Sequence, residues 1–442
     1  MDKFIPTLYK LYADYTNKFR AFPVVLDGLK YSERRILLST YQIARTKLKK
    51  SATIDGHTIG NFHPHSSVYS TIVQLVNRKL LDGQGSFGSN IGIEPCGASA
   101  SRYTEVKLSK FIDKTCFEFI DYVPWYKNEL GQKEPETLPT MFPICFLGKF
   151  IGQGIGVGFK TLIPNYELKD LHKRLMWLLK VEKEKPTIKP ISDCHITATN
   201  VELERLLTTG EAKIDVKGKL RESRRTGKIF LKAWPPFKSF EMFLKSPLFD
   251  NADVGYIDMS ANGQTNIVFE ITKKRNVNVI YDALLKFLNE KIIGSIPFKN
   301  NVVKDDLVKC VGIDEMFLTT FNNYVRINKV VLNQKIVDCQ GRILELGKLE
   351  KIKPHLAIIM GQTDIIEIDE KMERISKLSD VLLDDVKYLF GKYRIRKLLK
   401  IDTDTTEVFN EMEIHKENLK GITAFVLNKY DEIKDWNFEE ED

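Results

Sequence analysis

The helical pattern of the last part of the chain is the feature that most constrains its fold. Residues 316–338 are predicted to form one long helix, and residues 375–399 one or two more. A chain of 442 residues is expected to contain two or three domains. We therefore predict that residues 313–442 form a mainly helical part, distinct in character from what precedes it.

The rest of the chain mixes helices, strands and turns. Residues 1–138 combine helical periods with glycine-rich turns, whereas residues 139–312 show the short strands and helices that are typical of an α/β domain. The elements predicted in this middle part are strands within 193–199, 213–216 and 228–231 and helices at 168–181 and 277–291. The predicted fold class is α+β multidomain, with domains at 1–138, 139–312 and 313–442.

Composition and cysteine usage narrow the class of protein. No apolar run is long enough to predict a transmembrane helix, and the first residues lack the apolar stretch of a secretory signal. The six cysteines are scattered without a CxxC pair, which argues against a zinc site and a disulfide framework. We therefore expect a cytoplasmic protein with no membrane partner and no metal site of its own.

Positive charge is concentrated in one segment. The net charge of +8 permits nucleic-acid binding without requiring it. Between residues 30 and 50 the only acidic residue is Glu33. The basic residues of this segment are Lys30, Arg34, Arg35, Arg45, Lys47, Lys49 and Lys50. Residues 439–442 are all acidic and are predicted to form a solvated tail.

The glycine-rich segment 152–158 raises the possibility of a nucleotide-binding loop. A P-loop requires glycine where this chain has Phe159, because that glycine lets backbone N–H groups surround the phosphates. A dinucleotide fingerprint counted from Gly152 requires glycine where the chain has Val157. We therefore interpret the segment as a tightly turned, closely packed backbone.

The dipeptide Arg102-Tyr103 carries the strongest chemical signal. A tyrosine can act as a covalent nucleophile, although a free phenol titrates near pH ~10 and is weak at neutral pH. An adjacent guanidinium favours the phenolate and stabilises charge on a pentavalent phosphorus. Because most Arg-Tyr pairs are ordinary surface pairs, the argument depends on the surrounding sequence.

The surrounding sequence resembles the breakage-reunion subunit of type IIA DNA topoisomerases, the family of the A subunits of gyrase and topoisomerase IV. Five blocks between residues 20 and 165 occur in the family's order, which is far more specific than any one of them. The blocks are Arg20-Ala21-Phe22-Pro23 with Asp27-Gly28-Leu29-Lys30 and Arg34-Arg35; Lys50-Ser51-Ala52 to Phe62-His63-Pro64-His65; Leu81 to Gly88; Arg102-Tyr103-Thr104-Glu105; and Gly154 to Gly158 with Ile163-Pro164-Asn165. The layout is most similar to the phage-encoded medium subunit.

The resemblance implies roles for individual residues. Tyr103 aligns with the nucleophile that forms a 5′-phosphotyrosyl link, Arg102 with a transition-state stabiliser, and Arg20 with a further active-site arginine. The implied DNA-binding residues are Lys30, Arg34 and Arg35 at phosphates, His63 and His65 near the cleaved phosphate, and Ile155 as a wedge between base steps. By residue type alone, the histidines would be packed and hydrogen-bonded, and the isoleucine would belong to the core.

Three departures from the family pattern limit how far the family's properties can be carried over to this chain. The segment after His63-Pro64-His65 is shorter than usual, so the start of the next helix must differ and drug sensitivity cannot be carried over. The loop between Gly88 and Arg102 is longer than in gyrase. Glu33 stands where a histidine is common and would place a negative charge near the DNA.

Architecture and partners follow from the same resemblance. It implies a winged-helix domain with the catalytic tyrosine at 1–138, an α/β tower at 139–312, and a coiled-coil arm with a C-terminal dimer gate at 313–442. Cleavage in this family needs Mg²⁺ held by a D-x-D cluster of a TOPRIM domain. Asp402 and Asp404 lack a preceding strand and are interpreted as a cap or loop.

We therefore expect Mg²⁺ and ATP on partner subunits that carry the TOPRIM and ATPase parts. The other expected partners are double-stranded DNA and a second copy of the chain, joined through the C-gate. The chain leaves no room for the DNA-wrapping domain of gyrase, so we expect relaxation or decatenation rather than supercoiling. The expected setting is the nucleoid of a bacterial or phage-infected cell.

Two other function classes stay open. A non-catalytic winged-helix DNA-binding protein would bind DNA in a salt-sensitive way without forming a covalent adduct. A nucleotide-dependent enzyme built on residues 152–161 would bind ATP without a partner, although Phe159 weighs against it.

Overall fold

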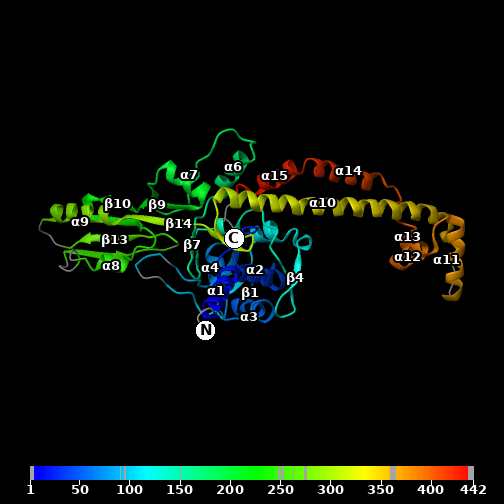
Figure 1. Ribbon diagram of the computed structural model, residues 1–442, viewed down its shortest axis with the longest axis horizontal. Helices are drawn as coiled ribbons and strands as arrows, with labels where there is room; N and C mark the ends of the chain where they lie inside the picture. The colour runs from blue at the N-terminus through cyan, green and yellow to red at the C-terminus, as the bar shows by residue number, and fades with distance from the viewer. Residues whose placement is uncertain are drawn as a thin grey trace. The chain divides into compact units, whose positions relative to one another are not determined.

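The computed structural model describes residues 4–436 except 90, 94–95, 150, 247–248, 250–252, 262, 273–275 and 359–364. Internal contacts divide the chain into two compact units: unit 1 is Met1–Tyr324 with Tyr430–Asp442, and unit 2 is Val325–Lys429. Unit 1 contains both helices and sheets, as predicted, whereas the described part of unit 2 is helical (Figure 1). The acidic residues 439–442 lie outside the described residues.

A small assembly of helices and strands forms the first part of unit 1. Its strands lie in the order β1-β3-β2 with antiparallel pairing, and the helices α2, α3 and α4 contact one another. Fully buried apolar residues at helical spacing, such as Ile72 and Leu75 of α4, hold the helices together. The elements are α2 (Tyr31–Ala44), β1 (Lys49–Lys50), α3 (Ser51–Asn61), α4 (Tyr69–Asn77), β2 (Leu81–Gln84) and β3 (Glu105–Leu108).

Shorter elements flank this assembly. Helix α1 precedes it and continues into a π-helical turn at Asn17–Ala21. A two-stranded hairpin of β4 and β5 follows it. The bounds are α1 (Phe4–Thr16), α5 (Lys110–Ile112), β4 (Trp125–Lys127) and β5 (Lys133–Pro135).

Two larger antiparallel sheets occupy the middle of the chain, with strand orders β6-β7-β14-β9-β8 and β10-β11-β13-β12. Leu203 and Leu206 of α7 pack on the first sheet, and Leu284 and Leu288 of α9 pack on the second. The strands are β6 (Gly152–Ile155), β7 (Lys160–Ile163), β8 (His195–Ile196), β9 (Glu211–Lys217), β10 (Lys219–Ser223), β11 (Lys228–Ala233), β12 (Val254–Asp258), β13 (Ile267–Ile271) and β14 (Ile293–Lys299). The helices are α6 (Leu168–Leu178), α7 (Asn200–Thr209), α8 (Phe240–Leu244) and α9 (Val277–Lys291).

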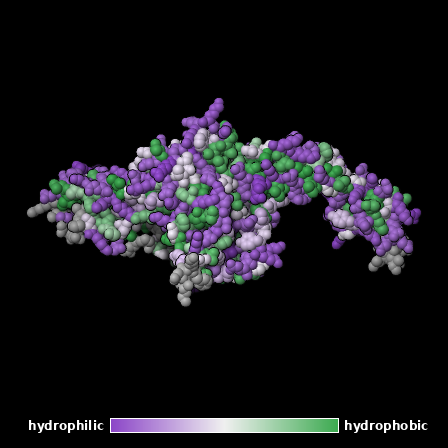
Figure 2. Space-filling view, in the orientation of Figure 1, coloured by the Kyte–Doolittle hydropathy of each residue, from purple (hydrophilic) through white to green (hydrophobic). Residues whose placement is uncertain are grey.

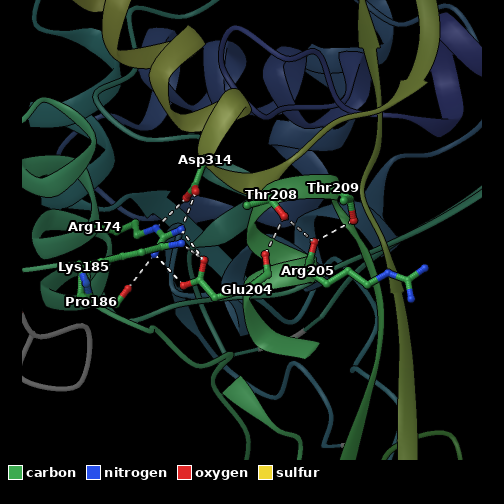
Figure 3. Close-up of polar contacts among 8 residues, drawn as sticks. All are labelled: Arg174, Lys185, Pro186, Glu204, Arg205, Thr208, Thr209 and Asp314. Atoms are coloured by element: carbon green, nitrogen blue, oxygen red, sulfur yellow. Dashed lines mark hydrogen bonds and ion pairs between the residues drawn. The ribbon is translucent and has the colours of Figure 1, made fainter. Parts of the chain in front are cut away.

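A buried cluster of charges joins α6, α7 and the first turn of α10 (Figure 3). The Arg174 side chain is 1% exposed and forms ion pairs with Glu204 at 2.9 Å and with Asp314 at 2.7 Å. Its guanidinium also donates to the Pro186 carbonyl at 2.8 Å. Lys185 approaches Glu204 from the more exposed side, at 2.5 Å. Three segments that are far apart in sequence are therefore held by one arginine.

Helix α10 begins in unit 1 and continues into unit 2. The predicted helix at 316–338 is confirmed but extends further at both ends. The region predicted to hold one or two helices at 375–399 contains parts of three, α11, α12 and α13, whose buried residues Ile375, Val386 and Leu398 share one core. The remaining bounds are β15 (Asn301–Lys304), β16 (Leu307–Cys310), α10 (Ile313–Ile352), α11 (Ile365–Ser379), α12 (Leu383–Lys392), α13 (Ile395–Leu398), α14 (Thr406–Lys420) and α15 (Ile422–Ile433).

Hydrophilic and hydrophobic residues are interspersed over the visible face of the molecule (Figure 2). Within the described residues, no helix is both long and apolar enough to cross a membrane. The long helix α10 carries charged residues along its length, including Asp314, Arg326, Lys335 and Lys351.

Candidate functional site

Tyr103 lies in a turn that is fixed to the N-terminus of α3. The N–H of Ser51 donates to the Thr104 carbonyl at 2.9 Å, and the N–H of Ala52 donates to the Ser101 carbonyl at 3.2 Å. The backbone is therefore held on both sides of Tyr103, while the Tyr103 residue itself is 65% exposed. This combination positions a phenol at the surface without restricting access to it.

Hydroxyl groups of neighbouring residues form hydrogen bonds that hold the Tyr103 turn in place. The Thr104 hydroxyl donates to Ser51 Oγ at 2.8 Å, and the Tyr69 hydroxyl lies 3.0 Å from Thr104 Oγ1. Gly85 adopts φ +109°, a conformation that favours glycine, and a Cβ there would lie 3.3 Å from the Tyr103 carbonyl oxygen. Residues from α3, α4 and the glycine-rich loop after β2 thus support the turn together.

The Arg102 guanidinium lies over the Tyr103 ring, with its central carbon 4.6 Å from the ring centroid. A cation in this position is attracted to the ring face, and it places positive charge beside the phenol. Both residues are exposed to solvent. The two residues that the sequence singled out are therefore in direct contact.

A second cluster contains both predicted histidines. The His63 and His65 rings are 4.8 Å apart, and Arg35 Nη1 lies 3.3 Å from His63 Nδ1. Arg35 also forms two hydrogen bonds with the Glu134 carboxylate, at 2.9 and 2.8 Å. Burial, followed by the positive charges of Arg35, His65 and Arg20, lowers the pKa of His63 to about 4. His63 is therefore neutral at pH 7.

Glu134 is a member of this cluster that the sequence did not reveal. It lies on β5 and is 3% exposed, and the Tyr126 hydroxyl from β4 donates to its carboxylate. Because the pairing of β4 with β5 brings these two residues to Arg35 from far along the chain, no local pattern pointed to them. Their contacts restrict Arg35, which is only partly exposed.

The Tyr103 turn and the histidine cluster lie at opposite ends of α3. Ser51, which anchors the Tyr103 turn, begins this helix, and His63 follows its last turn. An eleven-residue helix with a rise of about 1.5 Å per residue is roughly 15 Å long. The histidine cluster and the Tyr103 phenol therefore occupy different places within one chain. The basic residues and histidines of that cluster are Arg20, Arg35, His63 and His65.

Arg34 and Glu33 do not have the surroundings that the sequence suggested. Arg34 is 3% exposed and is paired with Asp27 through two hydrogen bonds of 2.7 and 3.1 Å. The expectation that Arg34 grips DNA phosphates is therefore corrected, because its guanidinium is buried and already neutralised. Glu33 is likewise buried, is paired with Arg78 at 3.0 Å, and accepts the Lys30 N–H, so it places no free negative charge at the surface.

The glycine-rich segment forms the β6–β7 hairpin. A Cβ on Gly154 would lie 2.2 Å from the Ala21 carbonyl oxygen, and one on Gly156 would lie 2.1 Å from Asn17 Oδ1. Gly154 and Gly156 are thus required by close packing, which agrees with the structural interpretation of this segment. Ile155 is 85% exposed at the end of β6, contrary to what its residue type alone suggests.

Lys30 connects this hairpin to the N-terminus of α2. Its Nζ donates to the Gln153 carbonyl at 2.5 Å, and burial lowers its pKa. Arg20 is exposed on the π-helical turn. Half-buried Lys30 therefore contacts the hairpin that carries exposed Ile155, whereas Arg20 lies near enough to the histidines to affect the pKa of His63.

The carboxylates of the D-x-D segment and of Glu105 have hydrogen-bond or ion-pair partners nearby. The Asp404 carboxylate accepts from the N–H and the hydroxyl of Thr406 at the start of α14, and Asp402 accepts from the Asp404 N–H. Asp402 and Asp404 thus lie in the loop that precedes α14, in agreement with the cap-or-loop interpretation. Glu105, which follows the tyrosine turn, is paired with Lys50 at 2.7 Å.

Comparison with known proteins identifies the family of the chain. The sequence model of the family of DNA gyrase and topoisomerase IV A subunits matches residues 20–437. The chain therefore belongs to this family, and the predicted resemblance to type IIA A subunits is confirmed. Its closer likeness to a phage medium subunit stays a prediction.

Individual relatives show how far the similarity extends. The chain is 30% identical to the DNA gyrase A subunit of Clostridium acetobutylicum over 463 residues, covering 94% of this chain and 53% of the relative. It is 25% identical to that of Haloquadratum walsbyi over 476 residues, covering 96% and 53%. Over 187 residues it is 37% identical to that of Neisseria gonorrhoeae, covering 38% and 20%. The chain thus spans about half the length of the relatives that it matches most fully.

Proposed function

We propose that this chain is the DNA-cleaving and rejoining subunit of a type IIA topoisomerase, with Tyr103 as its nucleophile. The observation that carries the proposal is an exposed tyrosine on a braced backbone, in contact with an arginine. The membership of the chain in the family of gyrase and topoisomerase IV A subunits supports it.

In the proposed reaction, the Tyr103 oxygen attacks a backbone phosphorus of DNA. A phosphotyrosyl bond to the 5′ end forms as the bond to the 3′ oxygen breaks, and the phenolic proton is exchanged for a proton on that leaving oxygen. The number of phosphodiester bonds is conserved, so the reverse attack reseals the strand without an energy source. Arg102 stabilises the charge on phosphorus in both directions.

The remaining predicted residues are proposed to hold the DNA. Arg35, His63 and His65 would contact a backbone phosphate at the far end of α3, and Lys30 would do so beside the β6–β7 hairpin. Arg20 is proposed as a further active-site arginine rather than as one of these DNA-holding residues. Exposed Ile155 is proposed to enter between base steps and bend the duplex.

The proposal extends to domains, partners and cofactors. Residues 1–138 would act as a winged-helix cleavage domain, 139–312 as a tower and 313–442 as a coiled-coil arm with a dimer gate. Two copies would cut both strands of one duplex, so that a second duplex passes through and DNA is relaxed or decatenated. We propose that partner subunits bind ATP and Mg²⁺, where the ion would stabilise charge at the scissile phosphate.

A covalent-trapping assay tests the proposal. The chain is mixed with candidate TOPRIM and ATPase subunits, Mg²⁺ or Ca²⁺, and end-labelled duplex DNA, then quenched with detergent and digested with protease. We expect protein-linked 5′ ends with the native chain and with Tyr388→Phe, a control at another exposed tyrosine. We expect none with Tyr103→Phe. If active partners and intact DNA binding give no adduct with the native chain, the chain is a non-catalytic DNA-binding protein instead.

A further inference from the structure

Three side chains of the types that can ligate a metal ion converge in unit 2, outside every residue group discussed above. Cys339 lies on α10, and Glu411 and His415 lie on α14. The cysteine sulfur, a carboxylate oxygen of Glu411 and a ring nitrogen of His415 are all within 4.8 Å of one another. Two helices that are far apart in the chain therefore present three different donor atoms to one point.

The surroundings of these atoms distinguish the group from an ordinary surface cluster. Glu411 and His415 are four residues apart, so they project from the same face of α14, with His415 Nε2 3.4 Å from a Glu411 oxygen. His415 Nδ1 is buried and has no hydrogen-bond partner among the described residues. Cys339 is 7% exposed, whereas the Glu411 side chain is 63% exposed. The group is thus buried on the cysteine side and open to solvent on the glutamate side.

The donor set selects a particular kind of ion. Thiolate, imidazole and carboxylate together are the ligands of Zn²⁺, which binds them at about 2.0–2.3 Å in a tetrahedron. Hard ions such as Mg²⁺ and Ca²⁺ prefer oxygen donors and disfavour the thiolate. We propose that Cys339, Glu411 and His415 bind one Zn²⁺ ion, with water as the fourth ligand, and that the ion fastens α14 to α10.

Binding has a defined stoichiometry. The Cys339 thiol loses its proton when the Zn–S bond forms, while His415 binds through a neutral ring nitrogen and Glu411 as a carboxylate. Each Zn²⁺ ion that binds therefore releases one proton from the thiol to solvent. No oxidant or reductant is involved. The scattered cysteines had argued against a zinc site, because a search for CxxC pairs does not detect ligands contributed by two distant helices.

Cobalt binding tests the proposal on the full chain, reduced and stripped with a chelator. Co²⁺ serves as the probe, because a tetrahedral site with a thiolate gives both visible d–d absorption and a sulfur-to-metal charge-transfer band. We expect one Co²⁺ per chain, displaced by one Zn²⁺, and a rise in the thermal unfolding temperature on adding Zn²⁺. Cys339→Ser should abolish the charge-transfer band, and His415→Gln should weaken binding by more than about ten-fold.

The matched controls are Cys310→Ser, which removes an exposed thiol, and His355→Gln, which removes another histidine of unit 2. Both should bind Co²⁺ as the native chain does. Circular dichroism of each variant shows whether it has folded. Glu411→Gln, at an exposed position, should also weaken Co²⁺ binding, because the amide is a poorer ligand than the carboxylate. The proposal is overturned if the folded native chain takes up no Co²⁺ or Zn²⁺ at stoichiometric concentrations, or if the charge-transfer band survives Cys339→Ser. Cys339 would then be a buried apolar residue beside an ordinary Glu–His pair on α14.

Discussion

Replacement of Arg174 by methionine should destabilise unit 1 far more than a typical surface change. Arg174 uses its guanidinium in five hydrogen bonds, to Asp314, Glu204 and the Pro186 carbonyl. Methionine fills much of the same space but leaves both carboxylates without this partner. These acidic side chains are 14% and 23% exposed and are therefore largely removed from water.

The size of the effect follows from that burial. Removing one partner from a buried ion pair typically costs about 3–5 kcal/mol, because the remaining charge is left unpaired. Since both carboxylates keep some access to water, and Lys185 stays beside Glu204, we expect the lower end, about 3 kcal/mol in the free energy of unfolding. Lys185→Met, in contrast, removes a side chain that is 43% exposed and should cost only about 0–1 kcal/mol.

Urea unfolding followed by tryptophan fluorescence measures this difference. Trp177 is a local reporter, because the Arg174 guanidinium lies 4.5 Å from its ring centroid. Arg205→Met is the matched control, since this arginine is on the same helix as Glu204 but its side chain points away from the cluster (Figure 3). A loss below about 1 kcal/mol for Arg174→Met, equal to that of the control, would refute the reasoning.

A compensated variant separates charge from shape. Combining Arg174→Met with Glu204→Gln and Asp314→Asn removes the unpaired charges and should recover part of the lost stability. If the triple variant is as unstable as the single one, packing rather than electrostatics explains the loss. Measurements of the native chain and both variants under identical salt conditions distinguish these results.

Three further predictions concern the candidate site. Folding lowers the pKa of His63 from the ordinary 6.5 to about 4, so the unfolded chain binds more protons between these pH values. The free energy of unfolding should therefore fall as the pH drops from 6.5 to 4. His63→Gln should flatten that part of the curve of stability against pH. Gly154→Ala should cost about 1–3 kcal/mol in thermal unfolding, because its Cβ would overlap the Ala21 carbonyl; no change would show that the hairpin moves freely. Ile155→Ser should leave the unfolding temperature nearly unchanged, because the residue is 85% exposed. The same change should reduce DNA bending, measured by fluorescence energy transfer. Equal bending by the native chain and the variant would contradict the wedge role.

Local patterns were sufficient to predict many elements of this fold. The helix at 277–291 and the strands at 213–216 and 228–231 are present, because their apolar residues recur at the period of the element itself. The same holds for Arg102 and Tyr103, which are neighbours in sequence and contact each other in space. In these cases the information lies within a few residues.

The errors and omissions share a different cause. The burial of Arg34 depends on Asp27, and that of Glu33 depends on Arg78, a residue of another part of the chain. A charge at the start of a predicted helix looks the same in sequence whether it faces solvent or a buried partner. Glu134 was missed for the same reason, since only the packing of its hairpin brings it to Arg35.

The position of helix α3 limits where this sequence can gain or lose residues. It separates the anchor of the Tyr103 turn at Ser51 from the histidine segment that begins at His63. One inserted residue within α3 would shift these two ends by about 1.5 Å and rotate one against the other by roughly 100°. The shortening that the sequence predicts relative to the family pattern would instead fall after His65, before α4 begins at Tyr69. In this connection, Asp55 accepts hydrogen bonds from Ser67 and Val68. Length can therefore vary in that connection without altering the geometry between the tyrosine and the histidines.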